Sequence, residues 1–418
     1  MSGKEKQWRL LADYVGGRDG EELVDALRDL YSIYDDRMIR WYAGLYDANI
    51  GGYYYSNSAK DNETVEYKGK LYKLLPDAEA TFHSVGMWRS LGVNGGITEW
   101  GRWLPDWMQK QVGDFIYNLQ DEDGYFYHEQ WGKDIPISRR ARDLMWSRHI
   151  LDAFGYTPKY KTVIDAGKGE ATEKTLIPDH LSSEEKFAEY LDKLNINERS
   201  YHSGNELAAQ SSQISALGRM EQCIKFLTEH QNKDGHWHYT TNYYAVNGLF
   251  KLYFLYDAAK LPFPNVMAAA KAAIDAITSD EPMTAVTDLY NTWYTVSNLL
   301  QNLRKYGGED GNKNADDIVC ELRRMAPYAI RRSKEKILPF KKADGAFSYG
   351  PRSSSQTSQG VPVCLPDMPE GDENATTIAS CGLVNNIFAA LELNDYKIGI
   401  FGDEERELYL SLLEAKRP

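Results

Sequence analysis

Cysteine is scarce in this sequence, and the cysteines present are scattered. The four are Cys223, Cys320, Cys364 and Cys381, and no two have the close spacing typical of paired zinc ligands. We therefore expect isolated thiols and no disulfide framework. We also expect no metal site and no cofactor.

Long apolar runs are also missing. No stretch of about 18 consecutive apolar residues, the length needed to span a bilayer, occurs in the chain. The first residues, Met1–Trp8, lack the apolar core of a signal peptide. The sequence therefore predicts no membrane partner and a cytoplasmic location, or a secreted or periplasmic one if a leader preceded it.

Positive charge is in deficit, whereas aromatic residues are abundant. The chain has 48 Lys and Arg against 61 Asp and Glu, giving a net charge of −13. This balance argues against a nucleic-acid partner, although it leaves room for a local basic pocket. The 29 Tyr, 10 Trp and 13 Phe include many in polar loops, where aromatic faces suit sugar rings as well as core and rim packing.

One loop pattern occurs three times at intervals of about 110 positions. It joins Asp-Gly to aromatic residues in the segments 120–128, 231–239 and 343–350. An interval of this length fits two helical hairpins, and hairpins must stack on neighbours to bury their apolar faces. If the stack closes into a ring, we expect the three loops to gather at one rim of a central cavity.

Apolar periodicity predicts helices along most of the chain. A small hairpin or lid is expected over 65–72. The expected helices cover residues 21–46, 77–91, 105–119, 138–154, 203–228 with a break near Gly218, 242–256, 264–277, 282–306, 315–334, 375–393 and 403–414. We predict one all-α domain over 1–418, an (α/α)6-7 toroid, with a polar insertion at about 156–200 and a long loop at about 351–373.

If inner and outer helices alternate, the first turns of the inner helices should face one site. The residues placed there are mostly neutral hydrogen-bonding or aromatic groups. They are His83, Arg142, His202, Asn205, His238, Asn242, Tyr290, Asn291, Tyr294 and Asn374. The arginines of 138–154 form either a solvated face or a surface presented to an acidic ligand.

Two loops carry a further resemblance. Phe115-(x)4-Gln120-(x)3-Gly124 and Phe226-(x)4-Gln231-(x)3-Gly235, each followed by aromatics, resemble the glutamine and aromatic repeat of terpenoid cyclases and protein prenyltransferases. The acidic motif of the protonating cyclases and the zinc ligands of the prenyltransferases are missing. The repeat therefore indicates the toroid more than the activity.

In architecture, length and residue types, the chain is more similar to the toroidal polysaccharide lyases of the glucuronan and alginate group. That resemblance implies β-elimination on an acidic polysaccharide or oligosaccharide. Asn242 and His238 would neutralise the substrate carboxylate, and Tyr294, or else Tyr290, would act as base and acid. The substrate-binding residues it implies are Arg142, Arg148, His149, His202, Asn205, Trp237, Tyr244 and His83.

Two other classes of protein fit the same sequence. A glycoside hydrolase on this toroid would need two facing carboxylates, for which the candidates are Asp143, Glu206, Asp288 and Glu373. A non-catalytic glycan-binding protein would need only the aromatic residues.

Overall fold

The computed structural model describes residues 3–61 and 64–418, and the fold within these residues is all-α, as predicted. Strands occur there only as short antiparallel pairs, of which β3–β4 is the hairpin expected over 65–72. The strands are β1 (Tyr46–Asp47), β2 (Gly52–Tyr53), β3 (Val65–Tyr67), β4 (Lys70–Tyr72), β5 (Thr357–Ser358) and β6 (Val361–Pro362). Among the described helices, none is long and apolar enough to cross a membrane.

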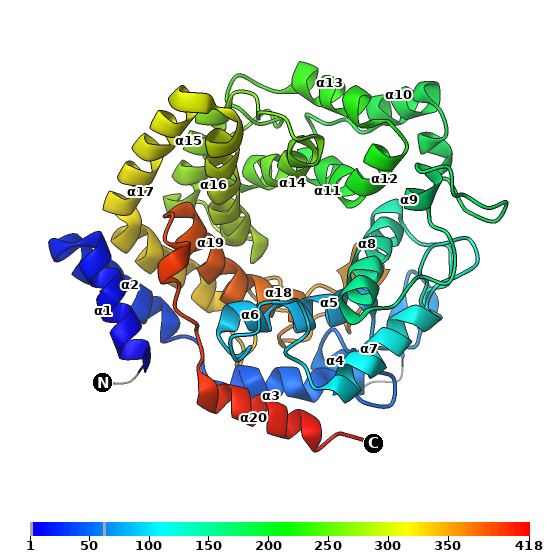
Figure 1. The fold of residues 1–418 in the computed structure, drawn as a ribbon, viewed down its shortest axis with the longest axis horizontal. Coiled ribbons are helices and arrows are strands. Elements are labelled where there is room, and N and C mark those ends of the chain that lie inside the picture. Colours follow the sequence, from blue (N-terminus) through cyan, green and yellow to red (C-terminus); the bar gives the residue numbers. More distant parts are fainter. Residues whose placement is uncertain (1–2, 62–63) are drawn as a thin grey trace.

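An inner set of helices makes contacts that run round a closed circuit (Figure 1). Each helix packs on the next, and the last segment returns to the first. The set is α5 (Ala78–Gly86), α8 (Ile137–Phe154), α11 (Ser200–Ala209), α14 (Tyr243–Ala259), α16 (Thr287–Tyr306), and α18 (Glu373–Thr377), which runs through the π-helical turn η3 (Ile378–Gly382) into α19 (Leu383–Ala390). This arrangement is compatible with a helical toroid.

Other helices lie on the periphery of that circuit (Figure 1). They are α1 (Gly3–Val15), α2 (Gly17–Tyr31), α3 (Asp36–Leu45), α7 (Asp106–Asn118), α10 (Glu184–Lys193), α13 (Met220–His230), α15 (Val266–Thr278), α17 (Gly308–Ile337) and α20 (Asp403–Glu414). Short elements complete the chain: α4 (Asn57–Asp61), α6 (Trp88–Leu91), α9 (Val163–Ala166), α12 (Ser211–Ala216), η1 (Asp179–Leu181), η2 (Leu338–Phe340) and η4 (Asn394–Tyr396). The core between the two sets is aromatic, with Trp88, Trp146, Trp237 and Trp293 fully buried.

Side-chain caps fix where several inner helices begin. Asp77 accepts a hydrogen bond from the backbone N–H of Ala80 at the start of α5, and Asn242 accepts one from Ala245 at the start of α14. Asp372 does the same for α18. Each cap satisfies a backbone donor that the helix itself leaves without a partner.

The three Asp-Gly loops join the peripheral layer to the inner one. Gly124, Gly235 and Gly345 all have left-handed backbone angles, with φ of 91°, 81° and 89°. Gln120 donates to the carbonyl of Tyr160 at 2.9 Å, and Gln231 donates to that of Pro264 at 3.1 Å. In the first two loops the glutamine therefore ties the loop to the segment that leads into the next helical element.

The expectation that these loops rim the cavity fits Tyr349 of the third loop, which lines it. It does not fit Phe126, Trp237 and Phe347, the aromatic residues two positions after each loop glycine, which are fully buried in the core. These three side chains turn into the core packing instead.

The expected helices differ from the observed ones mainly at polar breaks. The single helix predicted over 21–46 is two helices, because Asp35 caps α3 and starts it anew. The segment 203–228 breaks at Gln210 as well as near Gly218. Within 156–200, Ser183 caps α10 by accepting a hydrogen bond from the N–H of Lys186.

Candidate active site

A cavity of about 750 Å³ opens at the N-terminal ends of the inner helices. Its wall also includes Ser355 and residues 357–360, which belong to the long loop predicted over 351–373. Most of the polar residues that line it are Glu79, His83, Arg142, Arg199, Tyr201, His202, Asn205, Glu206, Lys251, Tyr290, Asn291, Tyr349, Ser358, Gln359 and Asn374.

Two basic side chains in this cavity form no ion pair with any residue of 3–61 and 64–418. A terminal nitrogen of Arg142 donates to Oδ1 of Asn205 at 2.5 Å, and the Nε of Arg142 is buried without a hydrogen-bond partner. Lys251 makes no hydrogen bond or ion pair with any residue that the structure describes. Burial, and secondarily the charge of Arg142, place the pKa of Lys251 well below its usual value. The wall is therefore locally basic in an acidic protein.

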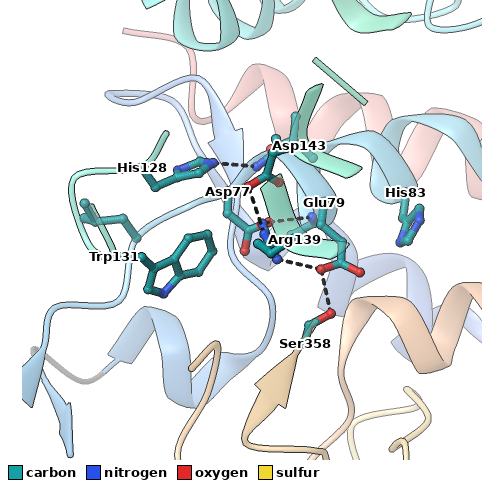
Figure 2. Close-up of polar contacts among 12 residues, drawn as sticks. Asp77, Glu79, His83, His128, Trp131, Arg139, Asp143 and Ser358 are labelled. Carbon is teal, nitrogen blue, oxygen red and sulfur yellow. Dashed lines mark hydrogen bonds and ion pairs between the residues drawn. The ribbon is translucent and has the colours of Figure 1, made fainter. Parts of the chain in front are cut away.

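The neighbouring arginine has the opposite surroundings (Figure 2). Arg139 is fully buried and pairs with Asp77 at 3.2 Å, Glu79 at 2.7 Å and Asp143 at 2.9 Å. Its guanidinium also lies 4.3 Å from the ring of Trp131. Burial raises the pKa of Asp143 to about 7, although Arg139 opposes this shift. This cluster joins α5 to α8 beneath the cavity wall.

Each glutamate that lines the cavity accepts hydrogen bonds from the protein, although Oε1 of Glu79 accepts none from the described residues. Glu79 accepts hydrogen bonds from Arg139 and, at 2.6 Å, from the hydroxyl of Ser358. Glu206 accepts from the hydroxyl of Tyr190 at 2.6 Å. Of the four carboxylates expected for a hydrolase, Glu206 alone is in the cavity lining, and Asp143 is held by Arg139.

The other two of those four carboxylates lie behind the wall. Asp288 is buried and accepts hydrogen bonds from Asn247 and Thr284 near the start of α16. Glu373 is buried, and neither of its oxygens accepts a hydrogen bond from the residues that the structure describes. Burial, with a further contribution from Glu79, raises the pKa of Glu373 well above its ordinary value.

His83 lies between Glu373 and the cavity. Its Nδ1 is 3.4 Å from Oε1 of Glu373, and its side chain is 20% exposed. Burial lowers the pKa of His83 to about 4, with Arg142 adding to the effect and Glu79 opposing it. The imidazole is therefore neutral near pH 7 and able to accept a proton.

Of the two tyrosines expected as base and acid, Tyr290 is in the cavity lining and Tyr294 is not. Their rings lie 5.5 Å apart on one face of α16, as expected from their spacing. Burial raises the pKa of both, with Tyr294 contributing at Tyr290 and Asp257 at Tyr294. The lowered pKa that a tyrosine base requires is not found at either residue.

The central loop is placed differently from the sequence expectation. Asn242 is the cap of α14, and His238 bonds to Thr240 within its own loop, so neither is in the cavity lining. Trp237 is in the core, where its indole N–H donates to the carbonyl of Leu227. Tyr244 shares a hydrogen bond of 2.9 Å with Nδ1 of His202.

Two further residues expected at the site lie elsewhere on α8. Arg148 donates to Thr162 and pairs with Asp165 at 3.5 Å. His149 is exposed and packs against Trp100, with ring centroids 4.8 Å apart. These arginines of α8 therefore point in different directions. Arg142 lines the cavity, whereas Arg139 and Arg148 do not.

Sequence reasoning missed several lining residues, notably Glu79, Lys251, Tyr201 and Tyr349. Lys251 lies more than two turns into α14, beyond the first turn on which the sequence argument concentrated. Its signal was a single lysine in an otherwise apolar helix. No group of histidine, cysteine, aspartate and glutamate side chains suited to a metal occurs in residues 3–61 and 64–418. Comparison of the chain with protein-family models and with curated proteins finds no match.

Proposed function

We propose that this cavity binds a uronic acid unit and cleaves a uronate-containing polysaccharide or oligosaccharide of the glucuronan or alginate type by β-elimination. The observation that carries the proposal is the pair Arg142 and Lys251, two basic side chains in the cavity that form no ion pair with the described residues. A buried or half-buried cation is stable only when an anion or hydrogen-bond acceptors compensate it. A sugar carboxylate supplies both.

The bound carboxylate is also where charge develops during the reaction. Removing the proton from C5 of a uronate places negative charge on the adjacent carboxylate group. Arg142 and Lys251 stabilise that charge from fixed positions, with Asn205 orienting Arg142 through its hydrogen bond of 2.5 Å. Donors held in place before the reaction stabilise such a charge more than water does.

His83 takes the proton in this proposal. We assign the proton of the neutral ring to Nδ1, which faces Oε1 of Glu373 at 3.4 Å, so that Nε2 is the base. The C5 proton passes to Nε2, the C5–H electron pair forms the C4–C5 double bond, and the C4–O bond breaks. Glu373 is a positioning residue that holds the ring from behind.

Tyr290 supplies a proton to the departing oxygen. Its phenol is protonated at neutral pH, as a proton donor must be, and the raised pKa excludes the phenolate that a tyrosine base requires. The phenolate then regains a proton from solvent, and His83 loses its own to solvent, so the site returns to its starting state. The roles of base and acid therefore fall on two residues.

The hydrolase alternative rests on Glu79 and Glu206, which are the two glutamates of the cavity lining. Both already accept short hydrogen bonds from protein groups. A hydrolase would release saturated sugars, whereas β-elimination leaves a double bond conjugated to the carboxylate. A binding protein would release neither product.

The experiment is an assay of the purified protein on glucuronan and alginate, followed by ultraviolet absorbance. We expect absorbance to rise with the wild type and to be lost in His83→Asn. The matched control is His230→Asn, because His230 is on the peripheral helix α13 and contacts its own backbone at Phe226. If new reducing ends are released without ultraviolet absorbance from unsaturated products, the protein is a hydrolase and the lyase proposal is refuted.

A further inference from the structure

The basic and aromatic surface of the cavity continues beyond its wall. Helices α11 and α14 pack side by side (Figure 1), and polar aromatic side chains follow the seam between them. We call this set the aromatic strip: Arg199, Tyr201, His202, Tyr244 and His238. The first three line the cavity, and the last two lie outside the lining.

The rings of the aromatic strip form a continuous row. The ring centroid of Tyr244 lies 6.0 Å from that of Tyr201 and 5.9 Å from that of His202. The ring of His238 follows at 5.0 Å from Tyr244. The hydrogen bond between Tyr244 and His202 fixes the middle of the row. A ligand that leaves the cavity along this seam meets aromatic faces throughout.

The aromatic strip also has a cation of its own. Arg199 is exposed, and its side chain forms no hydrogen bond or ion pair with the part of the chain that the structure describes. Its charge lowers the pKa of His202, after the larger effect of burial, so the two side chains are close together. Flat rings beside an unpaired guanidinium match the two features of a uronic acid unit, its ring face and its carboxylate.

We propose that the aromatic strip is a second sugar subsite, which binds the uronate unit joined to C1 of the unit in the cavity, on the side away from the C4–O bond that breaks. Arg199 binds the carboxylate of that unit, and Tyr244 with His238 contacts its ring. The proposal rests on the proposed uronate-binding function and adds a consequence to it. Longer uronate oligosaccharides bind more tightly than the shortest one, because they occupy both subsites.

The test compares uronate oligosaccharides of increasing length. KM and kcat are measured by product absorbance, and Kd is measured by calorimetry in a His83→Asn background, where the ligand stays intact. We expect Tyr244→Ala and Arg199→Gln to weaken the binding of long oligosaccharides by about three- to tenfold, a typical value for one aromatic or charged contact. The shortest cleaved oligosaccharide should keep its kcat.

Tyr239 provides the matched control. It follows His238 directly and is 71% exposed, yet it lines a separate depression that also contains Asp192 and Glu198. Those carboxylates repel a uronate, so Tyr239→Ala should leave the preference for length unchanged. An equal loss in Tyr239→Ala and Tyr244→Ala would overturn the assignment.

The outcomes separate this subsite from the reaction. If the wild type forms no unsaturated product, but binds longer oligosaccharides more tightly and Tyr244→Ala abolishes that preference, the subsite stands and the lyase activity is refuted. If the wild type forms product but does not prefer longer chains, or if the preference survives in Tyr244→Ala, the subsite is refuted and the lyase activity stands. If the wild type binds no uronate oligosaccharide, both proposals are refuted.

Discussion

Arg139 and Arg142 are three residues apart on α8, and their surroundings differ completely. Arg139 has three carboxylates around it and no exposure to solvent, so its charge is compensated within the protein (Figure 2). Arg142 has an amide oxygen, an unpartnered Nε and a place in the cavity lining. We infer from this difference that the charge of Arg139 stabilises the fold, whereas that of Arg142 is available to a ligand.

The largest expected effect is on stability, at Arg139 and its three carboxylates. Arg139→Met leaves Asp77, Glu79 and Asp143 together without their cation, and breaking a buried ion pair typically costs about 3–5 kcal/mol. We expect the free energy of unfolding, measured by urea denaturation, to fall by about that amount. A variant as stable as the wild type would show that the cluster does not hold α5 to α8.

Arg142→Gln should show the reverse pattern. Removing one preorganised donor at a developing charge typically lowers the rate by about 100-fold to 1000-fold. We expect a loss of that size in product formation, with little change in the urea midpoint, because no carboxylate is left unpaired. Equal losses of stability in Arg139→Met and Arg142→Gln would remove the distinction between the two arginines.

The pH dependence of the rate separates a histidine base from a tyrosine base. The folded-state pKa of His83 is lowered to about 4, so the neutral base is present above that pH and is lost as pH falls through it. We expect kcat/KM to rise through about pH 4 and then to stay level towards neutrality. A rate that keeps rising into the alkaline range would return the base to Tyr290.

The pH dependence of stability tests the cluster of Arg139 with Asp77, Glu79 and Asp143. The pKa of Asp143 is raised to about 7 in the folded protein from an ordinary value of 3.8. The folded state therefore binds this proton more tightly, so the contribution is present below about pH 4 and is lost as pH rises through about 7. We expect Asp143→Asn to flatten that decline in denaturation measured across this range.

The smallest effect is expected at Asn242. As a helix cap, Asn242→Ala should cost about 1 kcal/mol of stability, since the N–H of Ala245 loses its acceptor. Product formation should stay near the wild-type rate, because Asn242 is outside the cavity lining. An abolished reaction with an intact fold would return Asn242 to the role of carboxylate neutraliser.

The sequence predicted the all-α fold well because its signals are local. The Asp-Gly loops gave the positions of left-handed glycines, and the apolar spacing gave most helices. It also placed His83, Arg142, His202, Asn205, Tyr290, Asn291 and Asn374 at one cavity. Apart from His83, which is in the last turn of α5, these residues come from the first two turns of inner helices, which the alternation of layers brings together.

The remaining site residues depend on distances that a sequence does not contain. Arg139 and Arg142 look alike in a sequence, and only the packing of α5 against α8 decides which one meets Asp77 and Glu79. His238 and Asn242 were chosen for their position in a repeat loop, but a loop residue serves as a cap as readily as it serves a ligand. Lys251 was missed because it lies deeper along its helix.

The most direct test of the central claim is calorimetric titration of the protein with a glucuronan oligosaccharide and with a neutral glucan of equal length. If Arg142 and Lys251 await a sugar carboxylate, the wild type binds the uronate and not the glucan, and Arg142→Gln combined with Lys251→Gln abolishes the binding. Equal affinity for both sugars, or uronate binding that survives the double substitution, would contradict the claim.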